Sequence, residues 1–258
     1  MIIKNDIPIL EYDGESKEVF EANHESKDLV LPEKCVFAFL GDIVDDFALK
    51  HNARILETFE TVAQNFNVYS LNIDGQDICL VRSPIGAPAA TSLFDMLVNC
   101  GCKVVVAVGS CGTLSDLPEN AFVIPTKALR DEGTSYHYLP PSRFIDLDKN
   151  VISAIEYTLN SKSLPYEKTT TWTTDGLFRE TKDLVNYRLS EGCKVVEMEC
   201  SALAACARKR GSLFGQILFT ADSLANVDAH DPRNFGRDSH ELALTLCVET
   251  VLNIKRFN

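Results

Sequence analysis

Short apolar runs alternate with segments of helical periodicity along most of the chain. Residues 35–40 read CVFAFL and stop at Gly41, and residues 103–108 read KVVVAV and stop at Gly109. Apolar runs of this length are typical of strands that are buried on both faces of a sheet. Further strands are expected at residues 68–73, 78–81, 122–124, 165–173, 194–196 and 213–220.

Helical segments are expected between these strands. Apolar residues recur at helix-compatible spacing in residues 45–59, 89–100, 147–160, 200–209 and 239–254. Asp74-Gly75 separates two β-prone runs and predicts a hairpin. Because strands and helices alternate without a linker or repeat, the pattern predicts one α/β domain with a central mixed sheet over residues 34–258.

Residues 1–33 differ from this pattern, since they are polar and acidic with little periodicity. They are expected to form an N-terminal arm. The sequence leaves open whether this arm is ordered against a neighbouring subunit or is a mobile lead-in.

The charge balance limits the classes of partner. The chain has 258 residues and a formal net charge of −12. Nucleic-acid binders need clustered Lys and Arg for phosphate contacts, so we expect no nucleic-acid partner. No apolar run approaches the roughly 20 residues that span a bilayer, so we expect no membrane partner. A small anionic ligand remains compatible, because a few backbone N–H groups and one or two cations hold one.

The nine cysteines are expected to be reduced. Most lie in or beside apolar runs, where free Cys behaves as a small hydrophobe. Their number is odd, no secretory leader is recognisable, and Cys100-Gly101-Cys102 lacks zinc-ligand spacing. We therefore expect a cytoplasmic protein with structural thiols and no metal. Cys111 is considered separately because of its position in the chain.

Four segments lie where predicted strands end: Gly41-Asp42, Gly109 to Gly112, Glu197 to Glu199, and Ala221-Asp222. Ligands of α/β sheets gather at the carboxyl ends of strands. A pocket lined by backbone N–H groups and carboxylates is therefore expected there.

The acidic segments suggest specific chemistry, and each has a plainer interpretation. Glu197 and Glu199 flank Met198 directly after a strand, and a fixed carboxylate can accept from the vicinal hydroxyls of ribose. Acids are also common at a helix N-terminus because of the helix dipole. Asp222 follows an apolar strand, where partial desolvation would suit a general acid, although Asp also caps the next segment.

Two polar segments are less specific. Residues 109–112, Gly-Ser-Cys-Gly, are expected to form a tight turn that presents N–H groups and the Ser110 hydroxyl to an anion or a sugar, or an ordinary turn. Residues 131–143 are loop-rich, and their polar and aromatic content suits either a ligand cover or a solvated loop with a packed Tyr.

Taken together, these segments resemble the nucleoside phosphorylase-I superfamily, which includes purine nucleoside phosphorylases, uridine phosphorylases and methylthioadenosine/S-adenosylhomocysteine nucleosidases. The resemblance runs from about Cys35 to Ile254 and rests on Gly41-Asp42 and residues 83–86, 107–112, 195–199 and 220–222. It implies a twisted mixed sheet with a barrel-like portion, flanked by helices. It also implies a homodimer or homohexamer whose active sites borrow residues from the adjacent subunit.

The resemblance implies a role for each matching residue. Glu199 would bind the ribose 2′- and 3′-hydroxyls, with Met198 lining the sugar and Glu197 supporting it. Asp222 would protonate N7 of a purine leaving base. The remaining site residues fall into two groups, a phosphate or water site and a base-contacting segment: Gly41, Ser110 and Cys111, and then Leu177 and Phe178. Arg179-Glu180-Thr181 follows, without the Gln and Arg pair that reads uracil in uridine phosphorylases.

The nucleophile is the main departure from the family pattern. Asp45 and Ala107 stand where the phosphorylases have phosphate-binding arginines, and a third such position falls near Gln64. Nucleosidases lack these arginines and carry a carboxylate near Asp45 that orients the attacking water. Against this, cations elsewhere in the chain are candidates to replace the missing ones: Arg82, Arg130 and Arg179.

We therefore expect an enzyme that cleaves the N-glycosidic bond of a purine-type nucleoside. The favoured form is a phosphorylase that uses inorganic phosphate as co-substrate and no other cofactor. Hydrolysis with Asp45 orienting the water is the alternative. A catalytically weak nucleoside-binding protein and an unrelated α/β enzyme with Cys111 as nucleophile are the other hypotheses.

Overall fold

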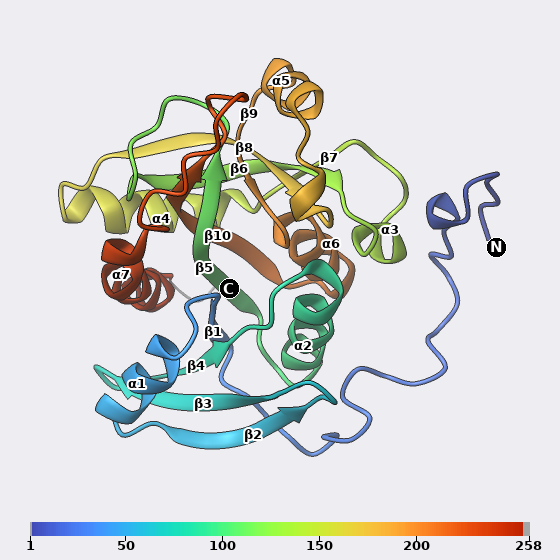
Figure 1. Ribbon diagram of the computed structural model, residues 1–258. Coiled ribbons are helices and arrows are strands. Elements are labelled where there is room, and N and C mark those ends of the chain that lie inside the picture. The colour runs from blue at the N-terminus through green and yellow to red at the C-terminus, as the bar shows by residue number, and fades with distance from the viewer. Residues whose placement is uncertain (1, 255–258) are drawn as a thin grey trace.

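The computed structural model describes residues 2–254, so the outer ends of the expected arm and domain, residues 1 and 255–258, lie outside the described residues. Within this range the chain forms one mixed sheet of ten strands (Figure 1). The strands are β1 Lys34–Ala38, β2 Arg54–Glu60, β3 Asn65–Ile73, β4 Gln76–Arg82, β5 Val104–Thr113, β6 Phe122–Asp131, β7 Phe144–Asp146, β8 Tyr166–Thr174, β9 Cys193–Glu197 and β10 Leu213–Ser223.

The sheet closes on itself over half of its strands. The order is β10-β6-β8-β9-β5-β1-β4-β3-β2, and β10 also pairs with β5 in parallel from Leu213 to Ser223. This additional pairing makes a closed barrel of β5, β10, β6, β8 and β9. The predicted mixed sheet with a barrel-like portion is therefore confirmed. β7 pairs with β6 at the barrel. The other strands, β1, β4, β3 and β2, extend from β5 as an open, twisted wing in which β2, β3 and β4 are antiparallel.

Helices pack on both sides of β5. In the described part of the chain they are α1 Ile43–Lys50, α2 Ala87–Asn99, α3 Ser135–Tyr138, α4 Lys149–Ser161, α5 Lys182–Ser190, α6 Cys200–Arg210 and α7 His240–Asn253, with single 3-10 turns η1 Pro8–Leu10, η2 Leu177–Arg179 and η3 Arg237–Ser239. α2 packs on α6, and α4 packs on α7. Figure 1 shows the two pairs on opposite sides of β5, which explains why that strand is apolar on both faces.

The helix predicted over residues 45–59 is wrong in its second half. α1 ends at Lys50, Asn52 adopts a left-handed φ of 52°, and β2 begins at Arg54. The left-handed residue ends the helix, because a right-handed helix cannot continue through that conformation, which Asn adopts more readily than most residues. Ile55, Leu56 and Phe59 have spacing that suits a helix, but they lie on the edge strand of the wing instead.

The tight turn predicted at residues 109–112 is also wrong, because β5 continues through Thr113. β1 stops pairing at Val108, but β10 continues alongside β5, and β9 pairs with Gly112 and Thr113. A Cβ on Gly109 would lie 3.0 Å from the Phe39 side chain. The glycines therefore permit close packing along a strand and do not bend it.

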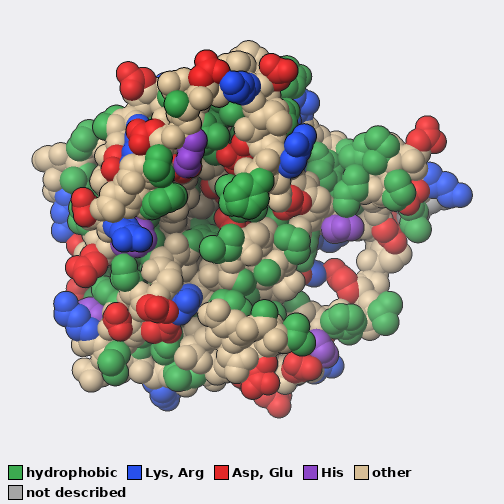
Figure 2. Space-filling model, viewed as in Figure 1, with side chains coloured by type: hydrophobic (Ala, Val, Ile, Leu, Met, Phe, Trp, Pro, Cys, Tyr) green, Lys and Arg blue, Asp and Glu red, His purple; other side chains and the backbone are tan. Residues whose placement is uncertain are grey.

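All nine cysteines are free and buried. Within residues 2–254 none of the helices is long and apolar enough to cross a membrane. The N-terminal arm runs beside α3 and α2 (Figures 1 and 2), where Tyr12 Oη donates to the Tyr138 carbonyl at 3.3 Å and Glu18 lies 2.9 Å from Arg210. The arm exposes Phe20, and its contact with another subunit stays a prediction.

Candidate active site

A cavity of about 420 Å³ opens at the carboxyl ends of β5, β9 and β10. Its lining combines acids, small polar groups and apolar side chains: Phe39, Ile85, Gly109, Ser110, Cys111, Gly112, Leu177, Glu180, Val196, Glu197, Met198, Glu199, Gln216, Ala221, Asp222, Leu224 and Phe235. Figure 2 shows a hollow on this face, with hydrophobic and acidic side chains around it. Three of the four strand-end segments therefore meet as expected.

Glu197 is a buried carboxylate that holds the start of α6. Its Oε2 accepts from the backbone N–H groups of Glu199 at 2.8 Å and Cys200 at 2.7 Å. Its Oε1 accepts from the hydroxyls of Thr173 at 2.6 Å and Thr171 at 3.3 Å. Burial raises the pKa of Glu197, while these four donors favour its charged form. The carboxylate thus fixes the backbone that carries the next acid.

Glu199 lies at the edge of the same cavity with 6% of its surface exposed. Its Oε1 accepts from the Gly86 N–H at 2.5 Å, in the loop before α2. Burial, together with the charge of Glu197, raises the pKa of Glu199 to about 8. With few donors inside the protein, this carboxyl retains most of its hydrogen-bonding capacity for a ligand.

Asp222 lies near the end of β10 and also lines the cavity. Its Oδ2 is 2.8 Å from His230 Nε2. An isolated bridge between Ser223 and Asp231 folds the following loop back, which brings His230 to this position. Asp222 therefore has a hydrogen-bonded partner on its outer oxygen while its side chain borders the cavity.

Asp45 lies outside the residues that line the cavity and has two partners. Tyr69 Oη donates to its Oδ1 at 2.6 Å, and Arg82 Nη1 donates to its Oδ2 at 3.1 Å. The same Arg82 nitrogen is 2.5 Å from Asp42 Oδ1. Two carboxylates therefore share one guanidinium next to Gly41, at the carboxyl ends of β1 and β4.

A family model described as the phosphorylase superfamily matches residues 35–254. The chain belongs to the phosphorylase superfamily. This confirms the resemblance seen in the sequence and the predicted enzyme class, nucleoside phosphorylase or nucleosidase. Guanosine phosphorylase of Halorubrum lacusprofundi is 24% identical over 209 residues, which cover 77% of this chain and 86% of that protein.

Solved structures share the superfamily fold. Uridine phosphorylase from Vibrio fischeri has a TM-score of 0.75 at 24% identity, covering 90% of this chain and 94% of that one. Purine nucleoside phosphorylase from Toxoplasma gondii, in complex with immucillin-H, has a TM-score of 0.73 at 18% identity, covering 87% and 91%. AMP nucleosidase from Bacteroides thetaiotaomicron has a TM-score of 0.70 at 21% identity, covering 87% and 89%.

Most of the site residues expected for a phosphorylase-superfamily chain are brought together. Those that line the cavity are Glu197, Met198, Glu199, Asp222, Ser110, Cys111 and Leu177. Gly41 and Asp45 are not among them. Phe178 follows Leu177 but points to solvent, with 95% of its surface exposed. The roles of these residues stay predictions.

Cys111 lines the cavity, yet it lacks the surroundings of a nucleophile. Its Sγ lies 3.5 Å from the Phe219 carbonyl oxygen. Burial raises its pKa well above the ordinary value, and the charges of Glu197 and Asp222 add to this. Reactive thiols have lowered pKa values in electropositive surroundings, so this thiol is better suited to packing.

The three candidate cations have different surroundings. Arg82 is the one beside Gly41, as described above. Arg130 is buried and donates to Ser135, Ser142 and the Pro140 carbonyl, and it stacks on the Tyr136 ring. Arg179 is exposed. None of these three arginines is among the residues that line the cavity.

Glu180 was not expected at the site. It directly follows η2 and lines the cavity. Burial raises the pKa of Glu180 to about 7, and the charge of Asp222 adds to this while His230 opposes it. In the sequence its only signal was a position next to Leu177 and Phe178. The sequence does not indicate that Glu180 and Asp222 share a site, because only the folded barrel brings the two residues to one cavity.

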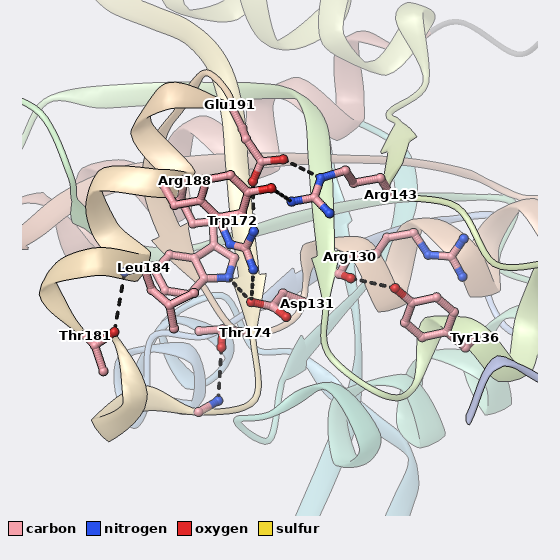
Figure 3. Close-up of polar contacts among 12 residues, drawn as sticks. Arg130, Asp131, Tyr136, Arg143, Trp172, Thr174, Thr181, Leu184, Arg188 and Glu191 are labelled. Atoms are coloured by element: carbon pink, nitrogen blue, oxygen red, sulfur yellow. Dashed lines mark hydrogen bonds and ion pairs between the residues drawn. The ribbon is translucent and has the colours of Figure 1, made fainter. Parts of the chain in front are cut away.

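The segment that carries Glu180 is anchored at both ends (Figure 3). On one side, Arg188 of α5 donates to Asp131 Oδ2 at 2.8 Å, and Trp172 of β8 donates to the same oxygen at 2.9 Å. Thr181 caps α5 by accepting from the Leu184 N–H at 3.4 Å. The barrel strands and α5 therefore hold the intervening residues 175–180 over the cavity.

Gln216 is another residue that the sequence did not indicate. It has 1% of its surface exposed, lines the cavity, and pairs in register with Ala107 of β5. Its buried Oε1 has no hydrogen-bond partner among the described residues. Buried polar atoms without partners are rare, and they are found where a ligand or water completes them.

Proposed function

We propose that this chain cleaves the N-glycosidic bond of a purine-type nucleoside, with inorganic phosphate as the nucleophile, and releases the free base and ribose 1-phosphate. The observation that carries the proposal is that the buried Glu199 and the partly buried Asp222 border one cavity of about 420 Å³. That volume lies within the range of small-molecule sites. Two carboxyl groups with different surroundings suit two roles, one toward the sugar and one toward the base.

Glu199 would accept hydrogen bonds from the ribose 2′- and 3′-hydroxyls. Its carboxyl accepts from the backbone of Gly86 and Met198, and burial raises its pKa to about 8. Hydroxyl donors favour the carboxylate form. Bound ribose would therefore supply further hydrogen bonds to the Glu199 carboxyl and favour its ionised form. Met198 would pack against the sugar, and Glu197 would keep the chain in place. As the base leaves, the sugar gains positive charge that a carboxylate stabilises.

Asp222 would act as the general acid that protonates N7 of the departing base. Its outer oxygen is 2.8 Å from His230 Nε2. After proton transfer Asp222 becomes a carboxylate, and a hydrogen bond from the imidazole N–H stabilises that charge. His230 is therefore a positioning residue for the acid.

Phosphate would bind near Ser110 and Gly41. The Ser110 side chain is exposed toward the cavity rim, and Arg82 supplies a cation beside Gly41. The relative from Halorubrum lacusprofundi, a guanosine phosphorylase, supports phosphorolysis of a purine nucleoside.

Hydrolysis is the second candidate, because Arg82 is already shared by Asp42 and Asp45. Two carboxylates against one guanidinium leave a net negative charge that disfavours a phosphate dianion. A neutral water would not be repelled, and Asp45 would orient it.

Base release measured with and without phosphate distinguishes phosphorolysis from hydrolysis. Inosine, adenosine and methylthioadenosine are the substrates, and ribose 1-phosphate or free ribose is identified as the sugar product. We expect turnover that requires phosphate, and a loss of about 10²–10⁴-fold in kcat for Asp222→Asn. Base release that is indifferent to phosphate and yields free ribose would establish hydrolysis. Nucleoside binding without turnover would instead indicate a binding protein.

Arg82 and Asp45 give opposite expectations for the two nucleophiles. In a phosphorylase, Arg82→Met raises the KM for phosphate by about tenfold or more, because a charge-assisted pair contributes about 1.5–3 kcal/mol. Asp45→Asn then has little effect or improves phosphate binding. In a hydrolase, Asp45→Asn lowers kcat instead. Asp183→Asn, an exposed acid on α5, is the control.

A further inference from the structure

Glu180 and Asp222 are two carboxyl residues that reach the cavity from different elements. Glu180 comes from the end of η2, and Asp222 comes from the end of β10. Both side chains line the same cavity of about 420 Å³, and burial there raises the pKa of Glu180. Within residues 2–254 the Glu180 carboxyl receives no hydrogen bond, so its polar atoms are available to a ligand.

The charged groups around Glu180 are mostly acidic. Asp222 and His230 act on it from β10 and the loop that follows, and Glu197 and Glu199 line the same cavity from β9 and the start of α6. Arg179, its neighbour in η2, is exposed and does not line the cavity. A carboxyl in such surroundings holds its proton more firmly than one in water.

Purine bases present N7 and the 6-substituent side by side on one edge. Guanine and hypoxanthine carry an acceptor, O6, next to N7, whereas adenine carries a donor, the 6-amino group. If Asp222 addresses N7, as the proposed function requires, the next group along that edge is the 6-substituent. The carboxyl of Glu180, in the same cavity as Asp222, is then in position to form a hydrogen bond with the 6-substituent.

We propose that Glu180 contacts the 6-substituent of the purine and determines base preference, by donating a hydrogen bond to a 6-oxo group or accepting one from a 6-amino group. Only the protonated carboxyl has a hydrogen to donate, and the carboxylate only accepts. Base preference therefore follows the protonation of one side chain. This inference rests on the proposed function for the orientation of the purine.

The pH dependence follows from the raised pKa of Glu180, about 7. Below that pH the group is neutral and matches a 6-oxopurine. Above it the group is a carboxylate and matches a 6-aminopurine. The preference for 6-oxopurines is therefore expected at low pH and is lost as the pH rises through about 7.

Binding of the free bases tests this without requiring turnover. Dissociation constants of hypoxanthine and adenine are measured by calorimetry at about pH 6 and about pH 8, where both bases are largely neutral. We expect the ratio of hypoxanthine to adenine affinity to fall by roughly 10- to 100-fold between these pH values in the wild type. Glu180→Gln, whose amide both donates and accepts, should show a ratio that does not change with pH. Asp183→Asn, the control, should behave as the wild type.

Three results would overturn the inference: a ratio that is the same at both pH values in the wild type, a pH-dependent ratio that persists in Glu180→Gln, or no binding of either base up to millimolar concentration. Nucleoside cleavage is assayed separately. A protein that shows the expected ratio but releases no base from any nucleoside would refute the proposed function and leave Glu180 as the base-reading group. A protein that cleaves purine nucleosides but has a hypoxanthine-to-adenine affinity ratio that does not change with pH would support the proposed function and refute the role of Glu180. Thermal unfolding of each variant verifies that it is folded.

Discussion

His230 Nε2 lies 2.8 Å from Asp222 Oδ2, and the two residues are only eight positions apart. The bridge between Ser223 and Asp231 forms the base of the loop that brings them together. The other oxygen of Asp222 faces β5, since a Cβ on Gly112 would lie 3.2 Å from Oδ1. The His230 imidazole thus binds Oδ2 of Asp222, and the absence of a side chain at Gly112 leaves space for Oδ1.

Replacing His230 should slow the proton transfer from Asp222. We expect His230→Ala to lower kcat about tenfold with little change in KM, because a hydrogen bond to a charged group contributes about 1.5–3 kcal/mol and forms fully only when Asp222 is ionised. His230→Gln should restore part of the rate, since its amide can also donate. Steady-state kinetics with a purine nucleoside measure both parameters.

His24→Ala, on the N-terminal arm, is the matched control and should leave kcat unchanged. A wild-type kcat in His230→Ala would mean that Asp222 needs no partner. A rise in KM alone would place His230 in substrate binding.

Glu197→Gln should destabilise the protein. The carboxylate accepts from four donors, and an amide would turn its NH₂ group toward two of them. Leaving buried donors unpaired costs about 1–3 kcal/mol each, so we expect a loss of about 2–4 kcal/mol in the free energy of unfolding. Urea denaturation measures it, with the exposed Glu60→Gln as control. A loss below about 1 kcal/mol would show that Glu197 is already protonated in the native protein.

The features that the sequence predicted correctly depend on local pattern. Apolar runs predicted β5, β9 and β10, and the carboxyl ends of these three strands carry Ser110, Glu199 and Asp222 to one cavity. Strand ends that share one edge of a sheet converge regardless of how the loops run. The superfamily motifs lie on these same segments, so the resemblance and the topology led to the same site.

The features that could not be predicted depend on contacts between distant segments. Gly109 to Gly112 has the composition of a turn, and only pairing with β9 and β10 keeps it extended. Glu180 acquires its chemistry from burial beside Asp222, which is 42 positions later in the chain. Asp45 was expected near the nucleophile, but Tyr69 and Arg82 bind it, and both come from the wing strands. No local signal encodes such pairings.

Gln216→Met should make the free protein more stable and less active. The unpartnered Oε1 is buried in β10, and an unsatisfied buried polar group costs about 1–3 kcal/mol. A side chain of similar volume without that oxygen should raise the free energy of unfolding by about 1 kcal/mol. Activity should fall, because the amide lines the cavity and its unpartnered Oε1 is available to a ligand. Urea denaturation and nucleoside cleavage are measured on the same preparation.

The matched control is Asn253→Met at the end of α7, away from the cavity. A variant that is both less stable and less active would indicate that Gln216 is a packing residue. A more stable variant with full activity would exclude it from the reaction.

Glu199 should make the stability of the free protein depend on pH. Its pKa is raised from 4.5 to about 8, so between these values the native state holds a proton that the unfolded state has lost. The unfolded state binds fewer protons there, and the free energy of unfolding therefore falls as the pH rises from about 4.5 to about 8. Glu199→Gln should remove this contribution and be more stable than the wild type at pH 8, by about 2–4 kcal/mol.

Urea denaturation at intervals between about pH 5 and about pH 8.5 measures the effect, and Glu60→Gln controls for the loss of an exposed charge. The advantage of Glu199→Gln over the wild type should shrink toward pH 5, because the wild-type carboxyl is then protonated in the native state. A bound nucleoside should remove the advantage at pH 8, since ribose hydroxyls stabilise the carboxylate and cannot do so for the amide. A difference between the two proteins that is constant with pH would mean that Glu199 is ionised throughout, held by the Gly86 N–H and the start of α6 without any ligand.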